Sequence, residues 1–414
     1  MARPAPIRIA GTIAATALCV AAATEAFAQD GVIVLNNQLQ LGDVIAGQTL
    51  NVEGATGETA ATTAAQGNSL AGTAQDRDLQ ITSGQRSDAD VGSSATLNLD
   101  GTLEGPVNAS TQAQGNYLGA AAYGGDLDIE TRQDIGPTEV TAGATINGPR
   151  ARMLGGASVS VDALGNTVSM AASASHVSGT VIQNSDAGVR AETYAETQYV
   201  PANAEFISQS TANSMALNSG LASSQDLTIR QRTSGDAVTA ATSANAANAW
   251  DLAGRARAAA NQTLLYNQGG SVVVTTDQSN LPEVRASAIV TSYDWGAATA
   301  VAEGVGNAVV VGNNDVYLQI DNAQVNSGGV QATADFAGTD GYDAYVSASA
   351  VGNTVTGYAC STCQGTLIAT NDQTNTGPVT ATGAATVRGT GRAVAASANA
   401  VGNAATFYVT RPGS

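Results

Sequence analysis

The chain is poor in the residues on which nucleic-acid binding and most enzymatic chemistry depend. Of its 414 residues none is lysine, one is histidine and three are cysteine. Charged residues make up 12% and aromatic residues 4%, both low values for a globular enzyme. The 16 arginines are scattered among 34 acidic residues, so no basic patch is available to neutralise a phosphate backbone. We therefore expect no nucleic-acid partner.

The single histidine limits the catalytic arrangements that the chain can build. A Ser-His-Asp or Cys-His group would have to use His176, which lies in an ordinary segment of the repeat described below. A zinc site based on histidines is excluded on the same ground. Acidic pairs such as Asp126 and Asp128 are typical of solvated strand or turn faces, and we predict no enzyme, cofactor or metal site. A β-helical polysaccharide-active enzyme, with two carboxylates facing one cleft, is the alternative.

What the chain has in abundance is small residues. Glycine accounts for 46 residues, and the 43% of hydrophobic residues are mostly alanine and valine. This apolar content is too high for simple disorder. It suits thin, tightly stacked β-structure with a narrow interior. The net charge of −18 would help to keep a long exported body soluble.

Residues 1–28 have the pattern of a secretory signal peptide. Arginines supply a positive start, residues 9–23 are small and apolar, and residues 26–28 fit a small-x-small cleavage site. The apolar run is short for a membrane span. We therefore expect an exported protein in which residues 29–414 form a single repeat domain.

A repeat of roughly 48 residues runs through that domain. An asparagine preceded by glycine, or twice by alanine, recurs at intervals of 46 to 50 residues. A glutamine recurs in phase with it at the same intervals, and a valine follows each glutamine by six or seven residues. Three markers in the same order, eight times, exceed what chance gives in a chain of this composition. The asparagines are Asn68, Asn116, Asn166, Asn213, Asn261, Asn307, Asn353 and Asn403, and the glutamines are Gln38, Gln85, Gln133, Gln183, Gln231, Gln278, Gln324 and Gln373.

Within each repeat the residues alternate with a period of two and are rich in threonine and valine, which favours strands. Residues 241–250 are alanine-rich and could form a helix on propensity alone, but their place in the repeat predicts a strand. The fold class is therefore all-β, a β-solenoid or β-helix of about eight repeats whose stacking makes one continuous core. Four strand segments per repeat fit either one large coil or two small ones, and the comfortable size of a coil favours two.

The repeated amides suit hydrogen-bonded ladders, in which each side chain bonds to its equivalent one coil away. Binding of a ligand along one face is the alternative for them. The glycine before the asparagine suits a corner with positive φ. Cys360 and Cys363 lie in a short insertion and are typical of a local disulfide in an exported protein. Trp250 and Trp295 lie in adjacent repeats and could stack on sugar rings, with ordinary packing as the alternative.

The signal peptide, the alanine-, glycine- and asparagine-rich composition and the markers resemble the holdfast attachment proteins of stalked alphaproteobacteria, most closely the holdfast attachment protein D family. Segments such as residues 157–161, and the closing Gly165-Asn166, carry the resemblance, which covers essentially the whole chain. The repeats are also reminiscent of curlin repeats, although those units are about half as long. The resemblance to the holdfast attachment proteins includes no diagnostic catalytic motif.

The resemblance implies a protein that anchors an adhesive polysaccharide, the holdfast, to the outer membrane at the cell surface. It also implies three partners, namely a curlin-like anchor subunit, an outer-membrane secretion lipoprotein and the polysaccharide itself. A separate expectation concerns the ends of the solenoid, because the first and last repeats start and stop with little extra chain. Poorly capped ends favour end-to-end self-association into a fibre.

Overall fold

The computed structural model describes residues 31–220, 222–360 and 365–410, and every regular element in them is a β-strand. The predicted signal peptide, residues 1–28, lies outside the described residues. All the strand pairs for which a register is given are parallel, each strand lying beside its equivalent in the next repeat. This is the predicted all-β solenoid. Over the same residues there is no helix long and apolar enough to cross a membrane.

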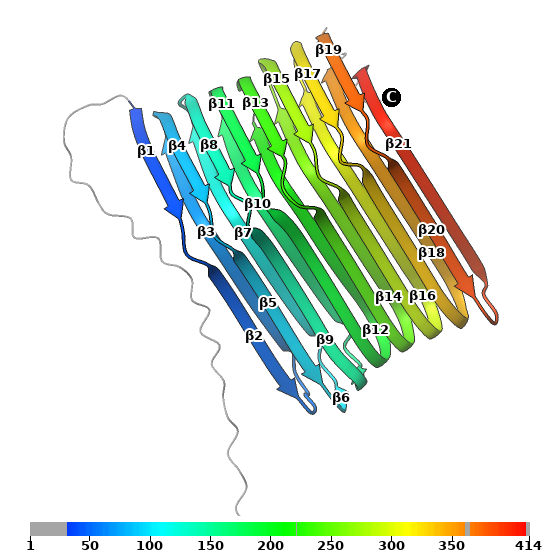
Figure 1. Ribbon diagram of the computed structural model, residues 1–414. Helices are drawn as coiled ribbons and strands as arrows, with labels where there is room; N and C mark the ends of the chain where they lie inside the picture. The colour runs from blue at the N-terminus through cyan, green and yellow to red at the C-terminus, as the bar shows by residue number, and fades with distance from the viewer. Residues whose placement is uncertain (1–30, 221, 361–364, 411–414) are drawn as a thin grey trace, which may run out of the picture. The chain divides into compact units, whose positions relative to one another are not determined.

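The first strand of each coil is about ten residues long and belongs to an eight-stranded parallel sheet (Figure 1). Its strands alternate inward and outward side chains, which gives the period of two seen in the sequence. In order along the sheet they are β1 (Gly31–Gln40), β4 (Asp78–Ser87), β8 (Leu127–Ile135), β11 (His176–Ser185), β13 (Ser224–Thr233), β15 (Ser271–Asn280), β17 (Tyr317–Asn326) and β19 (Thr366–Asn375).

The rest of each coil belongs to a second, larger sheet. In the first coils a short strand continues in the direction of the first one, and a longer strand then returns over the opposite layer (Figure 1). The short strands are β2 (Val44–Val52), β5 (Val91–Leu99) and β9 (Glu139–Met153), with β6 (Thr102–Leu103) beside β9, and the returning strands are β3 (Thr59–Gln75), β7 (Val107–Tyr123) and β10 (Ala157–Ser173).

In the later coils the short strand and the returning strand are joined through the reversal into one continuous element. These elements are β12 (Gly188–Ser219), β14 (Val238–Asn267), β16 (Val284–Asn313) and β18 (Val330–Cys360). The last coil separates them again, as β20 (Val379–Val387) and β21 (Ala393–Thr410). The alanine-rich residues 241–250 lie within β14, so the repeat frame predicted their conformation correctly and propensity alone did not.

The register fixes the size of the coil. Ser271 of β15 pairs with Tyr317 of β17, and Val177 of β11 pairs with Leu127 of β8, so neighbouring strands are 46 to 50 residues apart. One repeat therefore makes one coil, and the expectation of two smaller coils per repeat was wrong. The valine marker is in register as well, since Val189 pairs with both Val140 and Val238.

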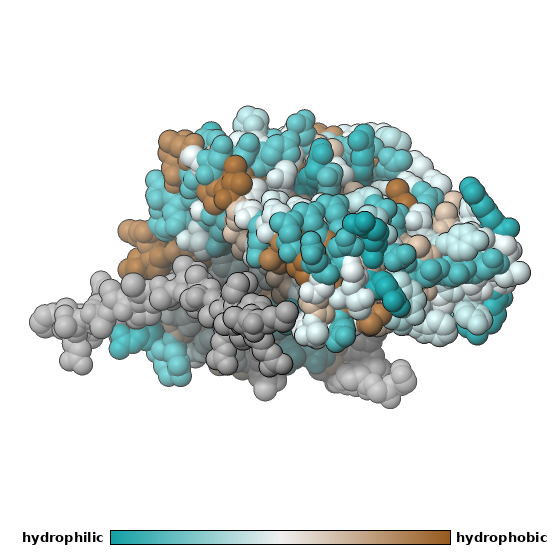
Figure 2. Space-filling view, turned by 90° about the horizontal axis from the view of Figure 1, so that it is seen from below, coloured by the Kyte–Doolittle hydropathy of each residue, from teal (hydrophilic) through white to brown (hydrophobic). Residues whose placement is uncertain are grey.

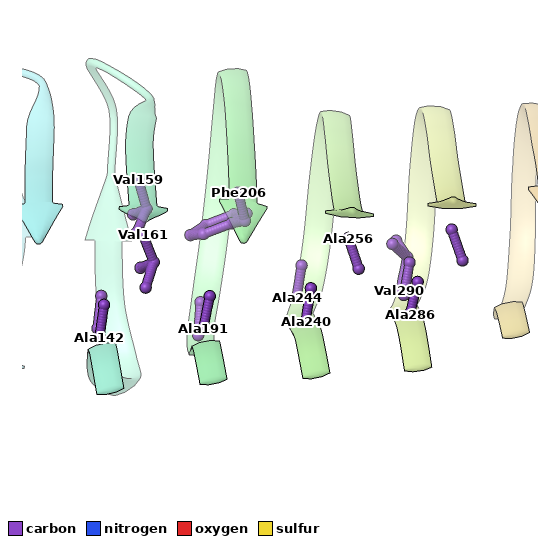
Figure 3. Close-up of a cluster of buried hydrophobic side chains, with 14 of the residues drawn as sticks. Ala142, Val159, Val161, Ala191, Phe206, Ala240, Ala244, Ala256, Ala286 and Val290 are labelled. Atoms are coloured by element: carbon purple, nitrogen blue, oxygen red, sulfur yellow. The ribbon is translucent and has the colours of Figure 1, made fainter. Parts of the chain in front are cut away.

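The core lies between the two layers and consists mainly of alanine and valine. One buried cluster joins the short strands to the facing half of the returning strands, and a second joins the first sheet to the other half. In Figure 3, Val159 and Val161 of β10 and Phe206 of β12 point into this interior with Ala142 and Ala191. Each coil alone could not bury these side chains, so stacking of neighbours supplies the stability.

The glycine before each marker asparagine does not adopt the positive φ that we expected. None of the glycines with φ between 65° and 158° is in a Gly-Asn marker. The marker position instead brings neighbouring coils close together. A Cβ on Gly165 would lie 2.3 Å from the carbonyl oxygen of Ala212 in the next coil, so the glycine leaves room for backbone rather than for an unusual dihedral angle.

Candidate functional site

The marker asparagines lie inside the solenoid and form one line of hydrogen bonds. Asn68 Nδ2 donates to Asn116 Oδ1 at 2.8 Å, and each asparagine donates in the same way to its equivalent in the next coil as far as Asn403, at 2.7 to 2.9 Å. The same Nδ2 of each asparagine from Asn68 to Asn353 also donates to a backbone carbonyl of the first sheet, such as that of Arg86 at 2.8 Å. We call this line the asparagine ladder, and it ties the two layers together.

The marker glutamines form a second line, which we call the glutamine ladder. Gln85 Nε2 donates to Gln38 Oε1 at 2.8 Å, and every later glutamine donates to the one before it, as far as Gln373, at 2.7 to 2.9 Å. Each Nε2 also donates to a carbonyl of the returning strand, beginning with Gln38 to Ser69 at 2.8 Å. The six interior glutamines are at most 1% exposed, so their amides need these partners.

The two ladders donate in opposite directions along the solenoid, which leaves complementary groups at its two ends. At the first coil, Asn68 Oδ1 accepts no hydrogen bond from the described residues, and Gln38 Nε2 has a proton to spare. At the last coil the pattern is reversed, because Gln373 Oε1 lacks a described donor and Asn403 Nδ2 has the spare proton. The asparagine ladder therefore ends in a free acceptor at the first coil and a free donor at the last coil, among the described residues. The glutamine ladder ends in a donor at the first coil and an acceptor at the last.

The apolar core is also uncovered at both ends. In the first coil the inward alanines of β3, such as Ala61 and Ala65, are buried. A further set of inward side chains in the first and last coils is only partly buried among the described residues, whereas their equivalents in between are buried. They are Val34, Val44, Ala46, Leu50, Val52 and Leu70 at the first coil, and Leu367, Val379, Ala381, Ala385, Val387 and Phe407 at the last. Each end thus presents half-buried apolar side chains beside the unpaired edge of a parallel sheet.

Large apolar side chains also point outward from the first coil. Leu35 is 78% exposed and Ile45 is 75% exposed, and Ile33, Leu39 and Leu41 are exposed with them. Figure 2 shows hydrophobic residues gathered toward the end of the molecule that carries β1. An exposed apolar group of this kind typically marks a contact surface. Its sequence signal is the run of valine, isoleucine and leucine at the start of β1, which our predictions from the sequence do not use.

A pocket of about 470 Å³ lies at the reversal between the two layers in the later coils. Trp250, Trp295 and Tyr342 line it, together with polar residues that include Asn248 and Asp340. The rings of Trp250 and Tyr342 meet edge to face, with their centroids 6.0 Å apart and an interplanar angle of 68°. The sequence contained a signal for the tyrosine that we did not use. Tyr342 follows Trp250 by 92 residues, which is two repeats of 46.

The structure separates the roles of the two tryptophans. Trp250 is 56% exposed, whereas Trp295 is 3% exposed and packs edge to face on Phe336 at 4.9 Å. The ring of Trp295 lies over Gly341, where an added Cβ would be 2.3 Å from the indole Cδ2. The exposed face available for stacking is therefore that of Trp250, and Trp295 forms the floor beneath it.

Charged groups surround the pocket. The backbone N–H and hydroxyl of Thr390 donate to Asp340 at 2.8 Å, and these bonds lower the pKa of the Asp340 carboxyl below its ordinary value. Arg392 lies 5.3 Å from the centre of the Tyr342 ring and forms an ion pair with Asp343. The hydrogen bond from Arg392 lowers the pKa of Asp343 as well. Both carboxylates stay ionised at neutral pH, and Asp343 balances the positive charge of Arg392.

The remaining residues singled out in the sequence do not meet in one place. Cys360 ends β18 with a buried side chain, and Cys363 lies outside the described residues, so their disulfide stays a prediction. His176 begins β11 on the surface, with Nδ1 2.7 Å from Ser224 Oγ. Across the described residues no group of three or more histidine, cysteine or acidic side chains is placed to hold a metal ion.

Comparison with known proteins identifies the family. The family model described as Holdfast attachment protein D matches residues 53–329, which is more than half of the chain. This match confirms the resemblance drawn from the repeat pattern. No curated protein and no solved structure matches the chain.

Proposed function

Because the chain belongs to the holdfast attachment protein D family, we propose that it is an exported, non-catalytic structural protein that anchors an adhesive polysaccharide at the outer membrane. The family implies a role in holdfast attachment and association with the cell surface. The proposal adds that copies of the chain stack end to end. The observation that carries this addition is the opposite polarity of the two ladders, which leaves each end of the solenoid complementary to the other.

End-to-end stacking would extend the existing structure by the interactions that already hold it together. Asn403 Nδ2 of one copy would donate to Asn68 Oδ1 of the next, as each asparagine donates within the chain. Gln38 Nε2 of the next copy would donate back to Gln373 Oε1. The half-buried valines of the first and last coils would then become fully buried. Such a head-to-tail contact does not close on itself, so it builds a fibre.

An anchor of this kind suits a structure whose contacts are all between neighbours. Pulling on one end is resisted by every coil in turn, since each coil is held by its backbone ladder and by both amide ladders. For partners, we propose the set that the family resemblance implies, namely a curlin-like anchor subunit, an outer-membrane secretion lipoprotein and the polysaccharide. The outward apolar side chains of the first coil, Ile33, Leu35 and Leu39, support a protein contact at that end.

A proline in the first coil tests the stacking. The N–H of Val44 and the carbonyl of Val52 both bond to the second coil. Backbone groups alternate in direction along a parallel strand, so the N–H of Thr49 points to the open end. Thr49→Pro removes that donor without breaking a hydrogen bond between described residues, and proline is tolerated on edge strands. Thr49→Val keeps the N–H and is the matched control.

We expect the mature chain and Thr49→Val to form concentration-dependent fibres in sedimentation and electron microscopy, and Thr49→Pro to remain short or monomeric. Circular dichroism checks that each variant is folded. Asn403→Leu gives an independent reading, because it removes the ladder donor at the other end and should also weaken assembly. A wild-type chain that stays monomeric at all concentrations would overturn the stacking, and so would Thr49→Pro assembling as well as Thr49→Val.

A further inference from the structure

We infer that the pocket formed by Trp250 and Tyr342 is a saccharide-binding site for uncharged or positively charged pyranose units. The inference deepens the proposed function, on which it rests, by assigning the contact with the polysaccharide to named residues. The pocket reaches the last coil through Thr390, but its rings and carboxylates lie in earlier coils, and none of the ladder groups used for stacking lines it. The sugar binding and the stacking can therefore succeed or fail separately.

The two exposed rings provide the apolar part of the site. Trp250 is 56% exposed and Tyr342 is 49% exposed, with Arg392 lying over one face of the Tyr342 ring. Gly296 occupies the equivalent position in the coil between them, and the Trp250 ring lies against its backbone, since an added Cβ would be 2.9 Å from the indole Cδ2. The absence of a side chain there lets the two rings meet. A pyranose has one face made largely of C–H groups, and an aromatic ring face is its natural partner.

A row of polar side chains provides the hydrogen-bonding part. Asn248, Asp294 and Asp340 occupy equivalent positions in three successive coils, because Asn248 pairs with Asp294 and Asp294 with Asp340. Their spacing is that of neighbouring strands, roughly 4.8 Å. All three line the pocket next to the rings. Amide and carboxylate groups beside an aromatic face match the mixed surface of a sugar, and the volume of about 470 Å³ lies within the usual range of ligand pockets.

The charges of the site decide which sugars it accepts. Two of the three polar groups are carboxylates, and the hydrogen bonds from Thr390 keep Asp340 ionised. Two cations lie beside lining rings: Arg392 is paired with Asp343, and Arg152 lies 5.4 Å from the centre of the Tyr199 ring. The whole chain also carries a net charge of −18. A polymer of uronic acids would be repelled, whereas neutral sugars would be accepted and amino sugars attracted.

The test uses the mature chain and three oligosaccharide hexamers, which are cellohexaose, a chitosan hexamer and a polygalacturonate hexamer. Binding is measured by calorimetry and by tryptophan fluorescence. The chain has two tryptophans, and only Trp250 is exposed, so fluorescence reports on the site. Trp250→Ala and Tyr342→Ala should each weaken binding by about tenfold, the scale of one aromatic contact. Trp250→Phe should restore most of it. Tyr123→Ala is the control, because Tyr123 is 44% exposed and lies outside the pocket.

We expect the neutral and cationic hexamers to bind and the acidic one not to bind. The inference is overturned if neither of the first two binds, if the acidic hexamer binds most tightly, or if Trp250→Ala and Tyr342→Ala bind like Tyr123→Ala. Fibre formation by the same variants separates this result from the stacking. Variants that assemble normally but do not bind sugar would support the assignment and leave the stacking intact.

Discussion

Replacement of one interior ladder asparagine should cost far more than its small size suggests. Asn261 is fully buried, and its Nδ2 donates to Asn307 Oδ1 at 2.7 Å and to the Ser279 carbonyl at 3.0 Å. Its Oδ1 accepts from Asn213 Nδ2 at 2.9 Å and from Thr233 Oγ1 at 3.0 Å. Asn261→Leu keeps a similar volume but removes all four hydrogen bonds. The substitution therefore tests the hydrogen bonds of the ladder with little change in side-chain packing.

The magnitude follows from the group left without a partner. Asn307 Oδ1 loses the donor that Asn261 supplies. The Ser279 carbonyl keeps its place as an acceptor in the backbone ladder between β13 and β15, and Asn213 Nδ2 keeps a bond to the Arg232 carbonyl. A buried polar group left unsatisfied costs about 1 to 3 kcal/mol, so the unsatisfied Asn307 Oδ1 predicts a loss of about 1 to 3 kcal/mol in the free energy of unfolding. The loss should be centred on the coils next to the substitution, because a repeat protein couples only to its neighbours.

Asn98→Leu is the matched control. Asn98 belongs to a similar line of amides on the surface, where Asn147 Nδ2 donates to it at 2.9 Å and it donates to Asn51 at 2.7 Å. Water can replace these bonds, so the control should change the stability by less than about 1 kcal/mol. Denaturant unfolding gives the free energies, and hydrogen exchange gives their location. Equal effects of the two substitutions would refute the reasoning that the buried ladder stabilises the coils.

Two further predictions concern single groups. Burial raises the pKa of the Asp162 carboxyl, despite hydrogen bonds from Ser160 and Gln209 that lower it. The folded state then binds this proton more tightly than the unfolded state, so stability should fall as the pH rises from the ordinary pKa of an aspartate, about 3.9, through the raised value. Asp162→Asn should therefore be more stable than the wild type at neutral pH and lose this advantage in acid. Denaturant midpoints of both proteins, measured across pH, check this. A difference in stability between the two proteins that does not change with pH would contradict it. For the predicted disulfide, peptide mass analysis should find Cys360 and Cys363 joined before reduction, and two free thiols there would disprove it.

The repeat explains why much of the fold was predictable. Markers that recur every 46 to 50 residues can only be in register if the coils stack, and the pairing of Asn166 with Asn213 shows that register. The number of coils per repeat was not predictable in this way. The break at residues 41–43 and the reversal at residues 53–58 are both rich in glycine and acidic residues, yet the chain turns back only at the second (Figure 1).

The candidate site was predictable only in part, because its geometry depends on residues in neighbouring coils. Trp250 and Trp295 were equivalent in the sequence, each lying near the same point of its repeat. Trp295 is buried because Gly338 and Gly341 of the next coil leave space for its ring, and an added Cβ at either would lie 2.3 Å from it. Such a contact joins positions more than 40 residues apart. The sequence around either tryptophan therefore does not reveal this contact.

We propose that this protein holds adhesive material on the cell surface. Deletion of its gene in the native cells, followed by labelling of the adhesive polysaccharide and fractionation of the envelope, tests this role. We predict that the mutant still makes the polysaccharide but sheds it, that surface attachment is lost, and that the wild-type chain is recovered with the outer membrane. Unchanged attachment in the mutant, with the wild-type protein found soluble, would contradict the account.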